Sequence, residues 1–485
     1  MPAESLIDLS ATELATRMRR CEFSPVEVIE AHLERIRLVN PRLNAIVTLP
    51  GDEARAQARA CERALAHGAP GVLLGVPFTA KDVLATAGVR TTCGSRLFAN
   101  HIPDADATVV ARIKAAGGIL LGKTNCPEFA LDLQTDNLLF GPTRNPWDEQ
   151  RTPGGSSGGD SAAVASGCTP LGIGTDFGGS LRWPAQCTGL VTIRPTTGLV
   201  PATGRLPSAS PLVPPPPNSL SFEGQVHVLG PLARSVDDLK LVLRVLAGPD
   251  GTDGQAMPVP LGDPNGVDVR QLAYAWCDGE GAWPVRPDVV AVAEQVARHL
   301  GRLGLRIDRR APPGLDRAEG IYSRLRAAEG LPAIQPLVGD RTEELGSTVR
   351  DLLEQSPPRT IAELLAINTE RDVVRAQLME FMREYPVILL PVAAVPAFPV
   401  GQRAFRVDNT NLPYWQVLAC CRAVSLLGLP AAVVPCGRSV EGLPVGVQVV
   451  GRPFEEATVL AVARLLEREF GGVQRPSELS IPAGA

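Results

Sequence analysis

The sequence predicts an α/β protein in which a central mixed β-sheet is covered on both faces by α-helices, all within a single large domain. Short apolar runs of strand length alternate with amphipathic helical segments along the chain. No linker-like segment divides the 485 residues, of which 45% are hydrophobic and 20% charged, as in globular proteins. We therefore expect one domain over residues 1–485, with N-terminal helices over 1–65 that pack on a core over 66–475.

The elements follow from local signals. Ser10 and Ser24 each begin a capping-box sequence, so the first 40 residues predict two helices, the second with Pro25 at its first position. The apolar run 72–78 predicts a strand that ends just before Lys81, and Asp106 is the expected cap of a helix that runs to about residue 116. Further expected strands are 119–121, 387–390, 431–434 and 445–450, and further expected helices are 236–246, 288–300 and 456–470.

Composition excludes several classes of protein. The net charge of −5 provides no basic surface for nucleic acid. The longest apolar stretch, 387–400, contains three prolines and cannot cross a bilayer as a helix. The N-terminus has no basic segment of the kind that begins a secretory signal. The ten cysteines show neither C-x-x-C pairs nor zinc spacing, which favours reduced thiols in a cytoplasmic protein without a metal site.

A Gly/Ser-rich centre is the most informative segment. Thr-Pro-Gly-Gly-Ser-Ser-Gly-Gly-Asp-Ser covers 152–161, and Gly-Thr-Asp-Phe-Gly-Gly-Ser-Leu-Arg covers 174–182. A phosphate-binding loop would need a lysine after the glycines, and the match to a dinucleotide fingerprint is poor. Residues 154–158 satisfy the G-x-S-x-G elbow of α/β-hydrolases, but that mechanism needs a later histidine, and only His227 and His299 follow, in strand-like and helical runs.

A serine without histidine needs another base, and lysine is the remaining candidate. Only Lys81, Lys114, Lys123 and Lys240 occur among the 47 basic residues. Lys81 follows an apolar run and precedes Val83, so we expect burial to favour its neutral amine. The competing interpretation is an ion pair between Lys81 and the adjacent Asp82.

Taken together, these residues resemble the amidase signature family over most of the chain. The agreement is densest over 154–197, and it extends to Val-Pro-Phe-Thr-Ala-Lys-Asp at 76–82 and Gly-Leu-Pro-Val-Gly-Val-Gln at 442–448. The resemblance implies the amidase signature fold and a Ser-Ser-Lys catalytic triad. It makes Ser180 the acylated nucleophile, Ser156 the bridging serine after a cis peptide bond and Lys81 the base. The residues alone do not choose Ser180 over Ser156.

The resemblance also implies the surroundings of the triad. Backbone N–H groups of Phe177, Gly178, Gly179 and Ser180 would form the oxyanion hole, and Ala130 would line the acyl side. Supporting roles in holding the loop fall to Ser157, Thr175, Asp176 and Arg182. The family's usual Lys-Pro-Thr motif has Arg194 here, which indicates a structural charge at that position.

The implied function is a serine hydrolase that cleaves the C–N bond of a small linear amide through an acyl-enzyme on Ser180, without a cofactor. Carbamates, in a urethanase activity, and aryl esters are further candidate substrates. The alternative is a glutamine-dependent amidotransferase A-type subunit that delivers ammonia to a partner chain; the segment 221–230 lacks the Ser-Leu-Asp-Gln pattern of such subunits. A non-catalytic scaffold would be expected only if a triad residue were missing. We expect a small-molecule substrate, no nucleic acid, no membrane, and a homodimer as the default assembly.

Overall fold

A large mixed sheet runs through the protein. The computed structural model describes residues 6–68, 70–208, 210–329, 331, 334–355 and 360–476, so the N-terminal residues used for the signal-segment prediction lie outside it. Eleven strands of these ranges form one sheet, and β10 (Phe405–Val407) pairs with β11 (Thr410–Leu412) apart from it. In sheet order the strands are β1 (Ile46–Thr48), β3 (Ile119–Thr124), β2 (Pro77–Lys81), β4 (Leu171–Asp176), β6 (Val228–Ala233), β5 (Val191–Arg194), β12 (Ala431–Arg438), β13 (Pro444–Gly451), β9 (Val387–Pro391), β7 (Ala273–Trp276) and β8 (Arg306–Arg309).

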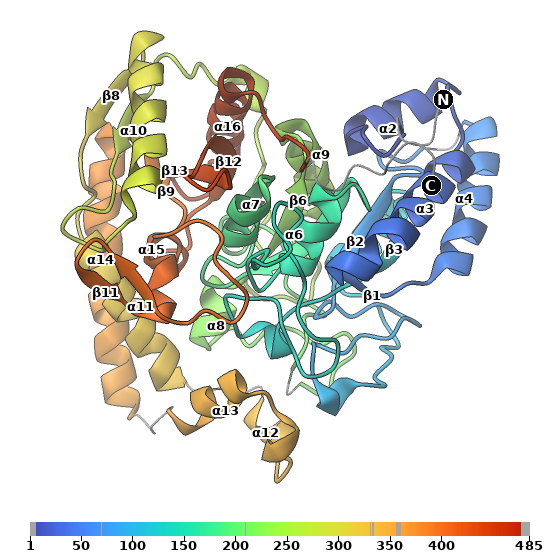
Figure 1. Ribbon diagram of the computed structural model, residues 1–485, viewed down its shortest axis with the longest axis horizontal. Helices are drawn as coiled ribbons and strands as arrows, with labels where there is room; N and C mark the ends of the chain where they lie inside the picture. Colours follow the sequence, from blue (N-terminus) through green and yellow to red (C-terminus); the bar gives the residue numbers. More distant parts are fainter. Residues whose placement is uncertain are drawn as a thin grey trace.

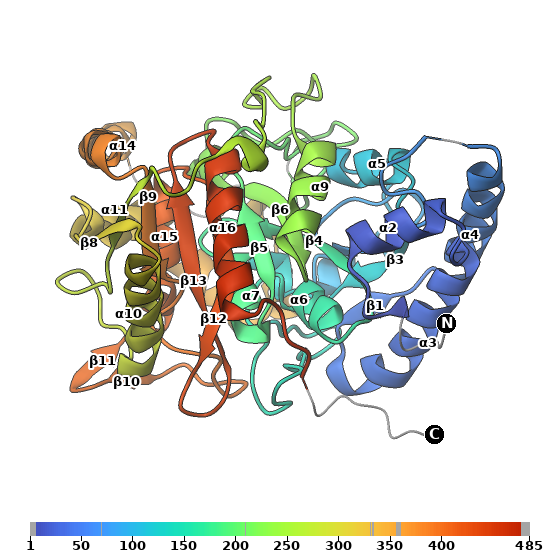
Figure 2. The same ribbon diagram turned by 90° about the horizontal axis from the view of Figure 1, so that it is seen from above.

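Helices cover this sheet and both of its ends. Figures 1 and 2 show α2, α3 and α4 at the β1 end, and α10, α11 and α14 at the β8 end. The helices are α2 (Ala11–Arg19), α3 (Pro25–Leu43), α4 (Gly51–Ala66), α5 (Thr108–Ala115), α6 (Gly158–Ala165), α7 (Arg182–Thr188), α8 (Phe222–Val226), α9 (Val236–Leu246), α10 (Pro287–Arg302), α11 (Leu315–Glu329), α12 (Gln335–Val338), α13 (Ser347–Glu354), α14 (Ile361–Glu384), α15 (Ala419–Leu426) and α16 (Glu456–Phe470). The sheet has both parallel and antiparallel pairs, which confirms the predicted fold class.

Two neighbouring parallel strands place the candidate site. Every residue of β2 and β4 is buried, as expected for strands covered on both faces. Because the two strands are parallel, their carboxyl ends, Lys81 and Asp176, meet at the same edge of the sheet. The loop that carries Ser180 follows directly after β4.

Most predicted elements are present, and several boundaries differ. Both capping boxes form, at Ser10 and Ser24. The run 72–78 is wrong as a strand, because Gly75 has a φ of +83° that breaks the extended backbone; the strand begins at Pro77 and includes Lys81. Asp106 is not a helix cap: its carboxylate instead accepts a hydrogen bond from Lys114 at 2.8 Å.

Burial and helix length complete the description. Eight of the ten cysteine thiols are buried, and all ten are free. Within the described ranges, no helix combines the length and apolar character needed to cross a membrane.

Candidate active site

Lys81 is the best-defined part of the site. The side chain at the end of β2 has no exposed surface. Its Nζ donates to Ser156 Oγ at 2.7 Å and to Thr175 Oγ1 at 2.9 Å. Burial lowers the pKa of Lys81 from its ordinary value to about 8, which makes the neutral amine accessible near neutral pH. The predicted alternative of a pair with Asp82 does not form, since that carboxylate accepts the backbone N–H of Thr92 instead.

Ser156 lies at the start of the turn that leads into α6. The Gly155–Ser156 peptide bond is cis, and the Ser156 side chain is almost fully buried. Its neighbour Ser157 holds the next strand, because Ser157 Oγ donates to the Thr175 carbonyl at 3.2 Å and accepts the Thr175 N–H at 3.3 Å. Two predicted supporting residues thus join the turn before α6 to the lysine partner.

Ser180 faces open space rather than the interior. It is partly exposed and lines a cavity of about 300 Å³. Its hydroxyl makes no hydrogen bond to Ser156 or to another described residue. Hydrogen bonds at reacting groups are often long or absent until substrate binds, so this geometry is compatible with a contact that forms in the substrate complex.

The backbone around Ser180 depends on glycine. Gly179 has a φ of +123°, and a Cβ there would lie 2.8 Å from Cys421 Cβ. The Gly179 N–H donates to the Asp176 carboxylate at 2.8 Å, so it is committed within the loop. This corrects the expectation that Gly179 provides an oxyanion donor. In the described part of the chain, the N–H groups of Phe177, Gly178 and Ser180 have no such acceptor.

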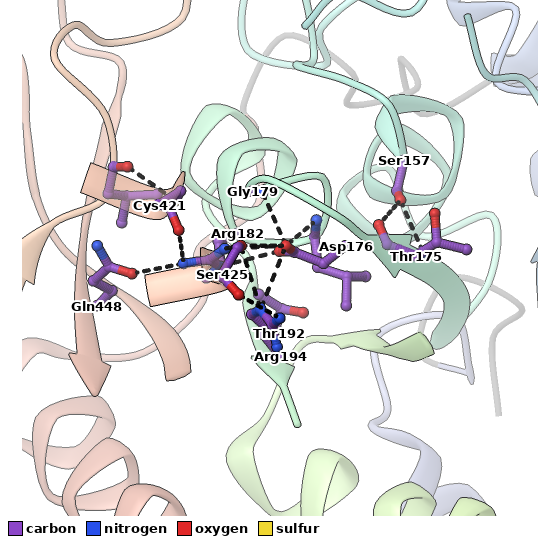
Figure 3. A network of polar contacts seen from close by, with 12 residues as sticks. Ser157, Thr175, Asp176, Gly179, Arg182, Thr192, Arg194, Cys421, Ser425 and Gln448 are labelled. Atoms are coloured by element: carbon purple, nitrogen blue, oxygen red, sulfur yellow. Dashed lines mark hydrogen bonds and ion pairs between the residues drawn. The ribbon is translucent and has the colours of Figure 1, made fainter. Parts of the chain in front are cut away.

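Asp176 and Arg182 brace this loop, as Figure 3 shows. The guanidinium donates to both carboxylate oxygens of Asp176 at 3.0 Å, and both side chains are fully buried. Burial alone would raise the pKa of Asp176, but the facing Arg182 holds that pKa well below its usual range. Arg194 lies 3.8 Å from Asp176 and donates to the Val226 carbonyl at 2.6 Å, which fits a structural charge.

The cavity brings together residues that are distant in sequence. Ala130, with a φ of +62°, lines it together with Phe177 and Gly178. Sequence reasoning missed Tyr322, whose hydroxyl lies 2.5 Å from the position a Cβ on Gly178 would take. The remaining lining residues include Leu131, Asp132, Leu133, Arg326, Leu352, Trp415, Leu418 and Arg422. No local motif marks Tyr322, because it reaches the site only through the packing of α11.

The two histidines of the α/β-hydrolase interpretation do not contact the triad serines. His227 lies between α8 and β6, not within a strand; its Nδ1 is 3.3 Å from Glu223 and its ring stacks on Phe177. His299 pairs with Glu469 at 3.0 Å. The second buried lysine, Lys123, donates to the Leu84 carbonyl and to Thr86 Oγ1. Ser156 is therefore paired with a lysine and not with a histidine.

Comparison with known proteins gives a consistent result. A family model described as "Amidase" matches residues 27–460. The A-type subunit of the glutamyl-tRNA(Gln) amidotransferase from Roseiflexus sp. (strain RS-1) is 34% identical, over 96% of each chain. Among solved structures, a bacterial aryl acylamidase of the amidase signature family has a TM-score of 0.86 at 27% identity, covering 98% of this chain and 99% of its own. A 6-aminohexanoate cyclic dimer hydrolase has a TM-score of 0.84 at 27% identity, covering 98% and 100%.

Proposed function

The chain belongs to the amidase family, and we propose that it cleaves the C–N bond of a small amide through an acyl-enzyme on Ser180. The observation that carries this proposal is the buried 2.7 Å contact between Lys81 and Ser156, next to the cavity that Ser180 lines. A lysine with a lowered pKa beside a serine is a recognised way of activating a hydroxyl nucleophile.

The proposed chemistry uses each group once in each half-reaction. Neutral Lys81 accepts the proton of Ser156 while Ser156 accepts the proton of Ser180, and Ser180 Oγ attacks the carbonyl carbon. The N–H groups of Phe177, Gly178 and Ser180 donate to the developing oxyanion, and one such donor is worth roughly 3–4 kcal/mol in comparable hydrolases. The proton returns through Ser156 to the leaving nitrogen. Water then hydrolyses the acyl-enzyme by the same relay.

The cavity favours an uncharged substrate with apolar groups. Leu131, Leu133 and Leu418 contribute aliphatic surface, and Trp415 contributes an aromatic ring. The carboxylate of Asp132 accepts hydrogen bonds from Tyr414 and, at 2.8 Å, from Thr348. Because that carboxylate is already engaged, the cavity is better suited to a neutral amide, with carbamates and aryl esters as further candidates, than to a zwitterion.

A second candidate is the A-type subunit of a glutamine-dependent amidotransferase. The curated relative at 34% identity carries that name and spans the same length, and this similarity favours the second candidate. Arg422 pairs with Glu319 at 3.0 Å, and Arg326 also lines the cavity, with its guanidinium over the Phe177 ring. Both candidates share the acyl-enzyme on Ser180 and differ in the acyl group and in the need for a partner chain.

Substrate turnover by the purified chain distinguishes them. We expect the chain alone to release the amine from a neutral anilide and to leave L-glutamine intact, and we expect Ser180→Ala to be inactive on both. Glutamine cleavage that appears only after a second protein chain is added would support the amidotransferase assignment instead. Undiminished anilide turnover by Ser180→Ala would overturn the shared acyl-enzyme step.

A further inference from the structure

A buried carboxyl group that the proposed chemistry does not use lies beside the triad. Asp160, in the first turn of α6, has no exposed surface. Its Oδ1 accepts one long hydrogen bond, from Thr79 Oγ1 at 3.5 Å, and its Oδ2 has no partner among the described residues. A buried carboxylate with so few donors is unfavourable unless a neighbouring cation or a proton neutralises it.

The strand geometry places this carboxyl on the side of β2 that carries Lys81. Thr79 and Lys81 are two residues apart on one strand, so their side chains share a face of the sheet. Gly172 of β4 pairs with Thr79, and a Cβ on Gly172 would lie 3.2 Å from Asp160 Oδ1. Asp160 therefore covers the position directly before Lys81 on that face, and α6, which carries it, begins two residues after Ser156.

We propose that Asp160 and Lys81 share a proton, and that Asp160 is a positioning residue that sets the pH at which Lys81 becomes the neutral base. The proposal rests on the proposed role of Lys81. As pH rises, the first proton leaves the pair as a whole, and the remaining one lies on either the carboxyl or the amine. A carboxylate at Asp160 stabilises the ammonium form of Lys81, so its negative charge delays formation of the free amine.

The ionisation of both groups agrees with this arrangement. Burial raises the pKa of Asp160 to about 7, while burial lowers the pKa of Lys81 to about 8. Titration of the two groups thus falls within one narrow range of pH, as sharing of a proton requires.

Other charged or titratable groups also face the pair. Burial raises the pKa of Cys126, so its thiol stays neutral, and burial lowers the pKa of His227 to about 4, so its imidazole is neutral too. Asp176 stays ionised through Arg182. Lys123 is the one of these that titrates in the same range, because burial lowers its pKa to about 8. The groups that act on Lys81 or Asp160 are Lys123, Cys126, Asp176, Arg205 and His227.

The test is the pH dependence of Ser180 labelling by a fluorophosphonate in Asp160→Asn, Asp160→Ser and Asp160→Glu. In the first two variants the acid limb of the labelling rate should move down by about one pH unit or more, since a nearby opposite charge shifts a pKa by that amount. Asp160→Glu keeps the charge and should keep the limb close to that of the wild type. A purely structural role would lower the labelling rate without moving the limb.

The outcomes separate this inference from the proposed function. Labelling of Ser180 with an unmoved limb in Asp160→Asn overturns the inference alone, whereas wild-type protein that is not labelled on Ser180 overturns the proposed function. If the variants do not fold, infrared difference spectra of the wild type provide the decision. They should show a protonated-carboxyl band that is lost as pH rises through about 7, and its absence at lower pH would refute the shared proton.

Discussion

Replacing Lys81 by methionine removes the proposed base while keeping most of the side-chain volume. With a pKa of about 8, roughly a tenth of the lysines are neutral at pH 7 and roughly nine-tenths at pH 9. The wild-type kcat/KM for a neutral anilide should therefore rise about tenfold between these values and then level off. The sign follows from the need for the free amine, which is present above this pKa and lost below it.

Lys81→Met should lower kcat/KM by about 10²–10⁴ at pH 9, the usual contribution of a general base, and the residual rate should show no step near pH 8. Lys123→Met is a matched control, because Lys123 is also fully buried and burial lowers its pKa to about 8, yet it donates to Leu84 and Thr86 and not to a serine. Its acid limb should remain. A step near pH 8 that survives in Lys81→Met but disappears in Lys123→Met would refute the assignment of the base.

Three further substitutions test the surroundings of the triad. Ser156→Ala interrupts the relay, so stopped-flow measurement should show acylation slowed by about 10²–10⁴, and a normal rate would exclude Ser156 as a bridge. Arg182→Met leaves the buried Asp176 without its guanidinium partner, so denaturant unfolding should show a loss of about 3–5 kcal/mol, and an unchanged midpoint would contradict the bracing role. Tyr322→Phe should reduce kcat/KM about fivefold through one lost hydrogen bond to the substrate, with unaltered unfolding; equal kinetics would place the hydroxyl outside the substrate contact.

Local signals in the sequence predict much of this fold. Ser10 and Ser24 form the predicted capping boxes, since the serine and the glutamate three residues later satisfy each other's N-terminal backbone groups. The helices over 236–246 and 456–470 have the predicted bounds. The strand that carries Lys81 begins later than predicted because the apolar run 72–76 contains Gly75, whose positive φ cannot be inferred from hydrophobicity.

The candidate site is predictable only where one motif holds it. Lys81, Ser156 and Ser180 come from motifs, and the structure pairs the first two. The commitment of the Gly179 N–H to Asp176 depends on how the loop folds back, which no spacing in the chain reveals. Tyr322 reaches Gly178 from a helix far along the chain, so its place depends on tertiary packing alone.

Locating the acyl group that forms during turnover tests the central proposal most directly. Quenched-flow mass spectrometry with an activated aryl ester, followed by peptide mapping, would identify the modified side chain. Our account predicts a transient adduct of the acyl mass on Ser180, absent from Ser180→Ala. An adduct on Ser156, or steady turnover without any covalent intermediate, would contradict it.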